Sequence, residues 1–225
     1  MDLSYSCSLT RVPNLSSIAP DLEFLYLNGC PSLAEIPSLQ NLSKFVELHM
    51  RCSKLNRGVE EIRIPDLSSI APNLEFLYLD NCKSLVEIPF FENLSNLVEL
   101  HMRYSKLMQP WSRGNKPLGK LKLMDLSYTS NLIGIPDLSS IAPNLEFLYL
   151  TGCWSLVEIP SLQNPLRDLK LMDLSFSHQL ISIPDLSSIA PNLEFLHLRR
   201  CTSLVEIPSL QNLSKLTELN LSKCS

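Results

Sequence analysis

Residues 22–42 read LEFLYLNGCPSLAEIPSLQNL, and close variants of this phrase recur along the whole chain. The segment LEFLYL returns at Leu74 and Leu145, and LEFLHL stands at Leu193. Successive units begin at Leu22, Phe45, Leu74, Leu97, Leu121, Leu145, Leu169, Leu193 and Leu216. Seven of the eight complete units are 23 or 24 residues long. This period indicates that the chain is built from one repeated structural unit.

Within each unit the apolar residues follow the frame L-x-x-L-x-L-x-x-(C/S/T)-x-x-L-x-x-I-P, which is the leucine-rich-repeat signature. One such unit cannot bury its leucines alone, but stacked units share a continuous apolar core. Leucine supplies 46 of the 225 residues, which is enough for such a core. We therefore predict an α/β solenoid, a leucine-rich-repeat horseshoe with a parallel concave sheet and short 3-10 or irregular convex segments.

The phrase DLSSIAPN occurs three times, beginning at Asp66, Asp137 and Asp185. Each copy is expected to lie on the convex side of the predicted solenoid. Asp and Ser are good helix N-caps, and the residue before a proline disfavours helical geometry. Each copy is therefore predicted to form a single helical turn, which Asp or Ser caps and Pro ends.

The ninth position of the frame always holds Cys, Ser or Thr, and this small side chain is expected to close the turn after the strand by bonding backbone groups. Five of the seven cysteines fall at this position. An odd number of cysteines excludes a full set of internal disulfides, and no CxxC pair suggests zinc. We expect buried thiols at these five positions, because disulfides between repeats would have poor geometry there.

We assign residues 1–225 to one solenoid of about ten repeats, which we expect to be truncated at both ends. The unit that begins at Phe45 is 29 residues long, and we define residues 45–73 as an irregular repeat. Its segment 56–63 has one glycine, four charged residues and no leucine frame. We expect this segment to form a mobile loop on the convex or lateral side.

Composition excludes several classes of function. The net charge of −4, without a long basic run, argues against nucleic-acid binding. No apolar stretch reaches the length of a membrane-spanning helix, so we predict no membrane insertion. Residues 114–120 match GxxxxGK, but Leu121 stands where a nucleotide-binding P-loop needs Ser or Thr. The histidines have no visible catalytic partner, and we predict a protein that is not an enzyme and holds neither a cofactor nor a metal.

The third, fifth and seventh positions of each unit lie outside the leucine frame and are expected to point to the concave face. We predict that a protein partner binds there, through Phe24, Tyr26, Glu47, His49, Arg51, Phe76, Tyr78, Glu99, His101, Arg103, Phe147, Tyr149, Phe195, His197 and Arg199. Exposed Phe and Tyr on a rigid sheet are typical of interface anchors. The alternative is that these aromatic side chains only pack against neighbouring strands.

Four consecutive phrases are more specific than the general frame. Residues 97–107 read LVELHMRYSKL and residues 110–118 read PWSRGNKPL. They are followed by LKLMDLSYTSNLIGIPDLS at 121–139 and LEFLYLTGCWSLVEIPS at 145–161. This series resembles the repeat domain of plant TIR-type nucleotide-binding leucine-rich-repeat (TIR-NBS-LRR) disease-resistance proteins. The resemblance covers the whole chain, in which the family's TIR and nucleotide-binding modules have no counterpart.

The resemblance implies a protein-recognition module of an intracellular plant immune receptor, in the cytoplasm or the nucleus. In this family the repeat domain senses a pathogen effector or a guarded host protein and restrains the receptor's own nucleotide-binding domain. It thereby contributes to signal transduction in plant defense and innate immunity. Three alternatives remain: a generic leucine-rich-repeat interaction scaffold, a truncated non-functional gene product, and an extracellular or polygalacturonase-inhibitor-like repeat. Only residues 132–136 resemble the L-x-G-x-I-P phrase of that last class.

Overall fold

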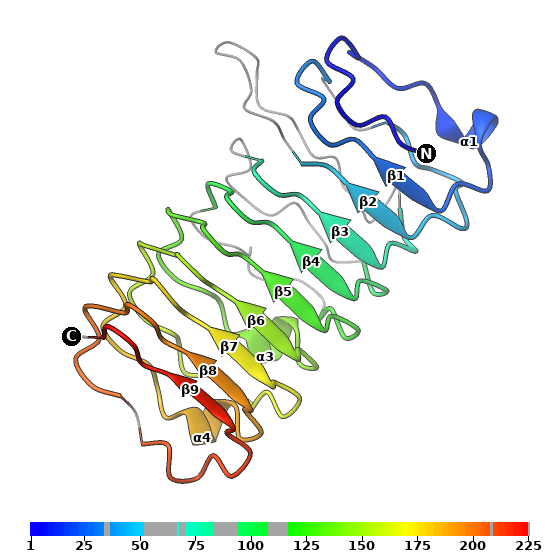
Figure 1. The fold of residues 1–225 in the computed structure, drawn as a ribbon. Helices are drawn as coiled ribbons and strands as arrows, with labels where there is room; N and C mark the ends of the chain where they lie inside the picture. The colour runs from blue at the N-terminus through cyan, green and yellow to red at the C-terminus, as the bar shows by residue number, and fades with distance from the viewer. Residues whose placement is uncertain are drawn as a thin grey trace.

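The computed structural model describes residues 1–33, 37–51, 67, 71–82, 94–107, 117–207 and 209–224. In this part of the chain, each unit adds one three-residue strand to a single parallel sheet whose strands lie side by side in chain order (Figure 1). The strands are β1 (Phe24–Tyr26), β2 (Glu47–His49), β3 (Phe76–Tyr78), β4 (Glu99–His101), β5 (Leu123–Asp125), β6 (Phe147–Tyr149), β7 (Leu171–Asp173), β8 (Phe195–His197) and β9 (Glu218–Asn220). The predicted leucine-rich-repeat solenoid with a parallel sheet is confirmed.

The strand register places equivalent residues of successive units beside each other. Leu100, at the centre of β4, pairs with Leu77 of β3 and with Met124 of β5. All three side chains are fully buried, whereas the residues that flank the strand centres are mostly half-buried. Because successive strand residues point to opposite faces, the leucine frame builds one face of the sheet and the core behind it. We call the other side, which carries the flanking residues, the open face.

The core runs without interruption between the sheet and the segments that return behind it. In the unit that begins at Leu145, the side chains of Leu145, Leu148, Leu150 and Leu156 are each at most 1% exposed. The removal of this apolar surface from water is the main force that holds the stack together. Since the described buried residues form one core cluster that extends across the units, the open face is positioned by the packing of the array.

The short helical turns α1 (Leu15–Ile18), α3 (Leu138–Ile141) and α4 (Leu186–Ile189) interrupt the returning segments, and α3 and α4 lie behind the sheet in Figure 1. The Oδ1 atom of Asp137 accepts a hydrogen bond from the Ser139 N–H at 3.0 Å, which caps α3. Asp185 caps α4 in the same way. The predicted capped turn is therefore confirmed in two copies of DLSSIAPN, and the copy that begins at Asp66 lies largely outside the described residues.

The ninth-position side chains tie each turn to the preceding unit. The thiol of Cys153 donates to the carbonyl of Leu126 at 3.4 Å, and that of Cys201 donates to the carbonyl of Leu174 at 3.1 Å. Burial raises the pKa of Cys153 and of Cys201 to about 12, which suppresses the reactive thiolate. Both fit the predicted buried thiols, but the prediction is wrong at Cys82, which is disulfide-bonded.

Some predictions fall on residues that the structure does not describe. The segment 56–63 lies outside the described residues, as does most of the irregular repeat 45–73. None of the helices in the described part of the chain has the length and apolar character needed to cross a membrane.

Candidate functional site

The open face carries all of the residues that the sequence predicted as partner-binding. The aromatic, acidic and histidine residues of that set are the first and third residues of their strands. Arg51, Arg103 and Arg199 lie two residues beyond β2, β4 and β8. The structure therefore brings the predicted residues onto one surface, and their role in binding stays a prediction.

The N-terminal half of the open face is organised by a column of four rings from consecutive strands. The ring of His49 lies 4.6 Å from that of Tyr26 and 4.0 Å from that of Tyr78, centroid to centroid. The ring of Tyr78 in turn stacks on His101 at 4.5 Å, with the planes 16° apart. This spacing follows the distance between adjacent strands, so the parallel register itself produces the stack. The aromatic side chains here thus pack on neighbouring strands while part of each ring remains accessible.

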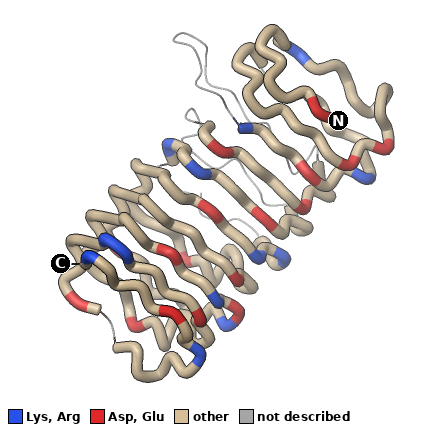
Figure 2. The backbone as a smooth tube through the Cα atoms, in the orientation of Figure 1, with Lys and Arg blue, Asp and Glu red and all other residues tan. Residues whose placement is uncertain are grey.

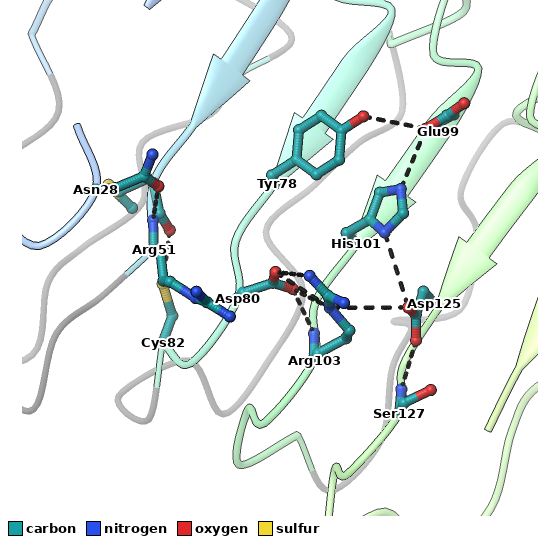
Figure 3. Close-up of polar contacts among 11 residues, drawn as sticks. Asn28, Arg51, Tyr78, Asp80, Cys82, Glu99, His101, Arg103, Asp125 and Ser127 are labelled. Atoms are coloured by element: carbon teal, nitrogen blue, oxygen red, sulfur yellow. Dashed lines mark hydrogen bonds and ion pairs between the residues drawn. The ribbon is translucent and has the colours of Figure 1, made fainter. Parts of the chain in front are cut away.

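Carboxylates contact the polar atoms of two of these rings, Tyr78 and His101 (Figure 3). The hydroxyl of Tyr78 donates to Glu99 at 3.1 Å, and the Nε2 atom of His101 lies 3.2 Å from the same carboxylate oxygen. On the other side of the imidazole, Nδ1 lies 3.8 Å from a carboxylate oxygen of Asp125. Asp125 is held in place by the backbone N–H of Ser127, which donates to it at 2.9 Å. His101 is therefore positioned between two acids.

The seventh positions of adjacent units form an ion pair at the end of the strands (Figure 3). The Nε atom of Arg103 donates to both carboxylate oxygens of Asp80 at 3.1 Å, and the backbone N–H of Arg103 donates to Asp80 at 3.0 Å. The side chain of Asp80 is only 7% exposed, whereas that of Arg103 is 38% exposed. Asp125 lies 3.8 Å from the Nε atom of Arg103, so the ion pair and the ring column form one polar network.

The C-terminal half of the open face repeats this chemistry with different strands. The Nε2 atom of His197 lies 2.9 Å from Glu218 of β9, and its Nδ1 atom lies 3.7 Å from Asp173 of β7. The ring of Phe147 has the ammonium of Lys170 5.9 Å from its centroid. A histidine between two carboxylates therefore occurs on β4 and again on β8.

The ionisation of His101 follows from this geometry. Burial of the imidazole disfavours its charged form, but the carboxylates of Asp125 and Glu99 outweigh burial and raise the pKa of His101 above its ordinary value. The pKa of Asp125 is lowered: its burial acts in the opposite direction, but its contacts with His101 and Ser127 prevail. The protonated imidazole consequently stabilises the fold below about pH 6.5, and this contribution is lost as the pH rises through the elevated pKa.

We expect Asp125→Asn to lower the pKa of His101, because it removes one of the two neighbouring carboxylates. The imidazole resonances, followed by NMR across the titration, measure this pKa directly. Asp173→Asn is the matched control, since it makes the same change beside His197 on a distant strand. An unchanged pKa of His101 in Asp125→Asn would contradict the proposed coupling.

Three aspartates of these networks were absent from the predicted set of partner-binding residues: Asp80, Asp125 and Asp173. Their positions in the repeat, the seventh and the fifth, are open-face positions that the sequence already identifies. The signal that could have found them is the pairing of like positions in adjacent units. Asp80 and Arg103 are both seventh residues, and 23 positions separate them.

Chemically, the open face is suited to recognition. The accessible parts of the rings offer apolar surface, and carboxylates accept hydrogen bonds from amides and from basic side chains. Within the described residues, no group of three or more His, Cys, Asp or Glu side chains is arranged to hold a metal ion.

Comparisons with known proteins agree with the repeat architecture, although no family model matches the chain. Disease resistance protein RPP4 of Arabidopsis thaliana is 35% identical over 210 residues, which cover 72% of this chain and 17% of that protein. Disease resistance protein RPP5 of the same plant is 37% identical over 145 residues, which cover 62% of this chain and 9% of that protein. The chain thus spans less than a fifth of the length of these relatives.

Among solved structures, the leucine-rich repeat domain of the type III effector XopL superposes with a TM-score of 0.55 at 21% sequence identity. The superposition covers 97% of this chain and 75% of that domain. At this identity the likeness concerns the fold alone. Together, the repeat frame, the parallel solenoid and the aligned relatives show a leucine-rich-repeat chain whose homologues, over the repeat region, are plant TIR-NBS-LRR disease resistance proteins.

Proposed function

We propose that the chain is the protein-recognition module of an intracellular plant immune receptor. In this proposal it senses a pathogen effector or a guarded host protein through the open face and regulates receptor activation through the receptor's own nucleotide-binding domain. It acts in the cytoplasm or the nucleus. The observation that carries the proposal is the alignment with RPP4, whose 210 residues cover most of the solenoid.

The chemistry of the open face supports the proposal. A protein partner offers the apolar, cationic and amide groups that half-buried rings and carboxylates recognise. The rigid array of short parallel strands holds these groups at fixed spacing, so little conformational entropy is lost on binding. Phe147 and Tyr149 lie on β6, near the middle of the described sheet, and aromatic residues are common among those that contribute most to binding.

The test is a screen of the purified chain, displayed on a surface, against secreted proteins of plant pathogens. We expect at least one specific partner, and we expect Phe147→Ser combined with Tyr149→Ser to weaken its binding at least tenfold, because truncated interface anchors lose their buried contact area. The matched control is Ile181→Ser combined with Val205→Ser. Ile181 and Val205 are 47% and 80% exposed, and both lie outside the strands. Their substitution therefore removes exposed apolar surface without changing the open face.

The melting temperature of each variant is measured alongside binding. Loss of binding in the open-face variant alone, at an unchanged melting temperature, supports recognition by this face. Equal loss in both variants, or the absence of any specific partner, would contradict the proposal. Unchanged binding with a large drop in melting temperature would show that Phe147 and Tyr149 are packing residues.

A further inference from the structure

A second surface runs along the edge of the sheet where the strands end. Wherever the structure describes it, the eighth residue of a unit adopts a left-handed backbone conformation, with positive φ at Tyr5, Gly29, Asn81, Tyr104, Tyr128, Gly152, Phe176, Arg200 and Lys223. Backbone hydrogen bonds connect these turns, since the N–H of Tyr128 donates to the carbonyl of Thr151 at 2.6 Å and that of Phe176 to the carbonyl of Arg199 at 2.7 Å. Equivalent side chains therefore follow one another at the strand spacing of about 4.8 Å.

Aromatic side chains occupy this edge in each of the four units that begin at Leu97, Leu121, Leu145 and Leu169. The rings of Tyr104 and Tyr128 stack in parallel at 4.7 Å, with 45% and 39% of each residue exposed. The Tyr128 ring also lies over Gly152, where an added Cβ would come within 2.7 Å of it. Trp154 follows in the next unit and is 52% exposed. Left-handed geometry is unfavourable for a bulky residue, yet Tyr104, Tyr128 and Phe176 keep it.

The same edge is cationic at its C-terminal end. The guanidinium groups of Arg199 and Arg200 lie 5.4 and 5.5 Å from the centroid of the Phe176 ring. Figure 2 shows Lys and Arg gathered at this corner of the solenoid, beside the C-terminus. We define Tyr104, Tyr128, Trp154, Phe176, Arg199 and Arg200 as the aromatic edge.

Carboxylates are absent from this edge, although the chain as a whole is acidic. The seventh to eleventh residues of the last six units, from Arg103 to Cys224, include no Asp or Glu. Among the described residues, neither Arg199 nor Arg200 has an ion-pair partner within 4.0 Å. The opposite edge differs, because Lys122 and Lys170 both pair with Glu146, at 2.9 and 2.6 Å.

We propose that the aromatic edge, which shares Arg199 with the open face, binds an acidic segment of a protein partner. The guanidinium groups of Arg199 and Arg200 can each donate paired hydrogen bonds to a carboxylate of the bound segment. The exposed aromatic side chains can pack against apolar side chains that lie between those carboxylates. The row from Tyr104 to Lys223 spans five intervals of about 4.8 Å, or roughly 24 Å, which accommodates about seven residues of extended chain. A single-stranded nucleic acid also combines anionic groups with rings that stack, and competition with an oligothymidine distinguishes it from an acidic peptide.

The test uses the whole chain and a fluorescein-labelled peptide of alternating Glu and Phe residues, about eight residues long. We expect saturable binding by fluorescence anisotropy, weakened at least tenfold by Arg199→Glu combined with Arg200→Glu. The control, Arg167→Glu combined with Lys215→Glu, makes the same change in net charge at exposed residues before the strands, and it should retain binding. Circular dichroism confirms that both variants are folded.

The competitors are a peptide with Lys in place of Glu and an oligothymidine of similar length, and neither should displace the probe. A second variant, Tyr128→Ser combined with Trp154→Ser, should also weaken binding while leaving net charge unchanged. No binding by the wild-type chain, equal loss in the charge-matched control, or displacement by oligothymidine would each overturn the proposal. The last result would instead favour a nucleic-acid site.

Discussion

Replacing Leu148 by alanine is expected to lower the free energy of unfolding by about 3 kcal/mol, because it leaves a cavity in a core that has little room to relax. Leu148 is the central residue of β6, is 1% exposed, and pairs with Met124 and Met172 of the neighbouring strands. Urea unfolding of the purified chain, followed by circular dichroism, measures the change. Because the core is shared between units, the substitution should lower the stability of the neighbouring units as well as its own.

Leu219→Ala is the matched control for this prediction. Leu219 holds the same central position in β9 but is 40% exposed. Less apolar surface returns to water there, so the expected loss is under about 1.5 kcal/mol. Equal losses at the two positions would show that the leucine frame does not carry the stability in the way the burial pattern indicates.

Asp80→Ala is expected to destabilise the fold by about 2 kcal/mol, since it removes a buried carboxylate that accepts several hydrogen bonds from Arg103. The loss should fall below the cost of breaking a fully buried ion pair, because the guanidinium is 38% exposed and water can replace part of the interaction. The pKa of Arg103 is raised chiefly by its hydrogen bonds to Asp80, which agrees with a pairing that favours the charged form.

A double-mutant cycle with Arg103→Gln separates the pair from its surroundings. We expect a coupling energy of about 1 kcal/mol or more between Asp80 and Arg103. Additive losses would mean that each residue contributes separately, Asp80 through the backbone N–H of Arg103 and Arg103 through Asp125. The side-chain ion pair between Asp80 and Arg103 would then not be the source of the stability.

The sequence predicts the architecture because each element of the solenoid is dictated by residues within one repeat. The leucine spacing determines which face of each strand is buried, and Asp137 and Asp185 specify capped turns through their own neighbours. Interactions within a short segment are readable in this way. The disulfide at Cys82 is a counterexample, since it departs from the ninth-position pattern of buried thiols.

The candidate site was only partly predictable, because its contacts join different repeats. The sequence placed His101 and Glu99 on one face. The contact between His101 and Asp125, however, joins two repeats, because Asp125 belongs to the unit that follows that of His101. Likewise, nothing within one repeat shows that Tyr104 and Tyr128 stack between adjacent repeats. Aligning equivalent positions of adjacent units supplies the missing neighbours, and side-chain conformation then decides which of them touch.

The claim that the open face recognises a protein partner is tested most directly by hydroxyl-radical footprinting of the chain, alone and bound to the partner found in the screen. Tyrosine oxidation reports side-chain accessibility residue by residue. We expect protection of Tyr26, Tyr78 and Tyr149 on the open face, and no change at Tyr5, which is 74% exposed at the edge. Unchanged oxidation of the three open-face tyrosines, with the partner fully bound, would contradict the account.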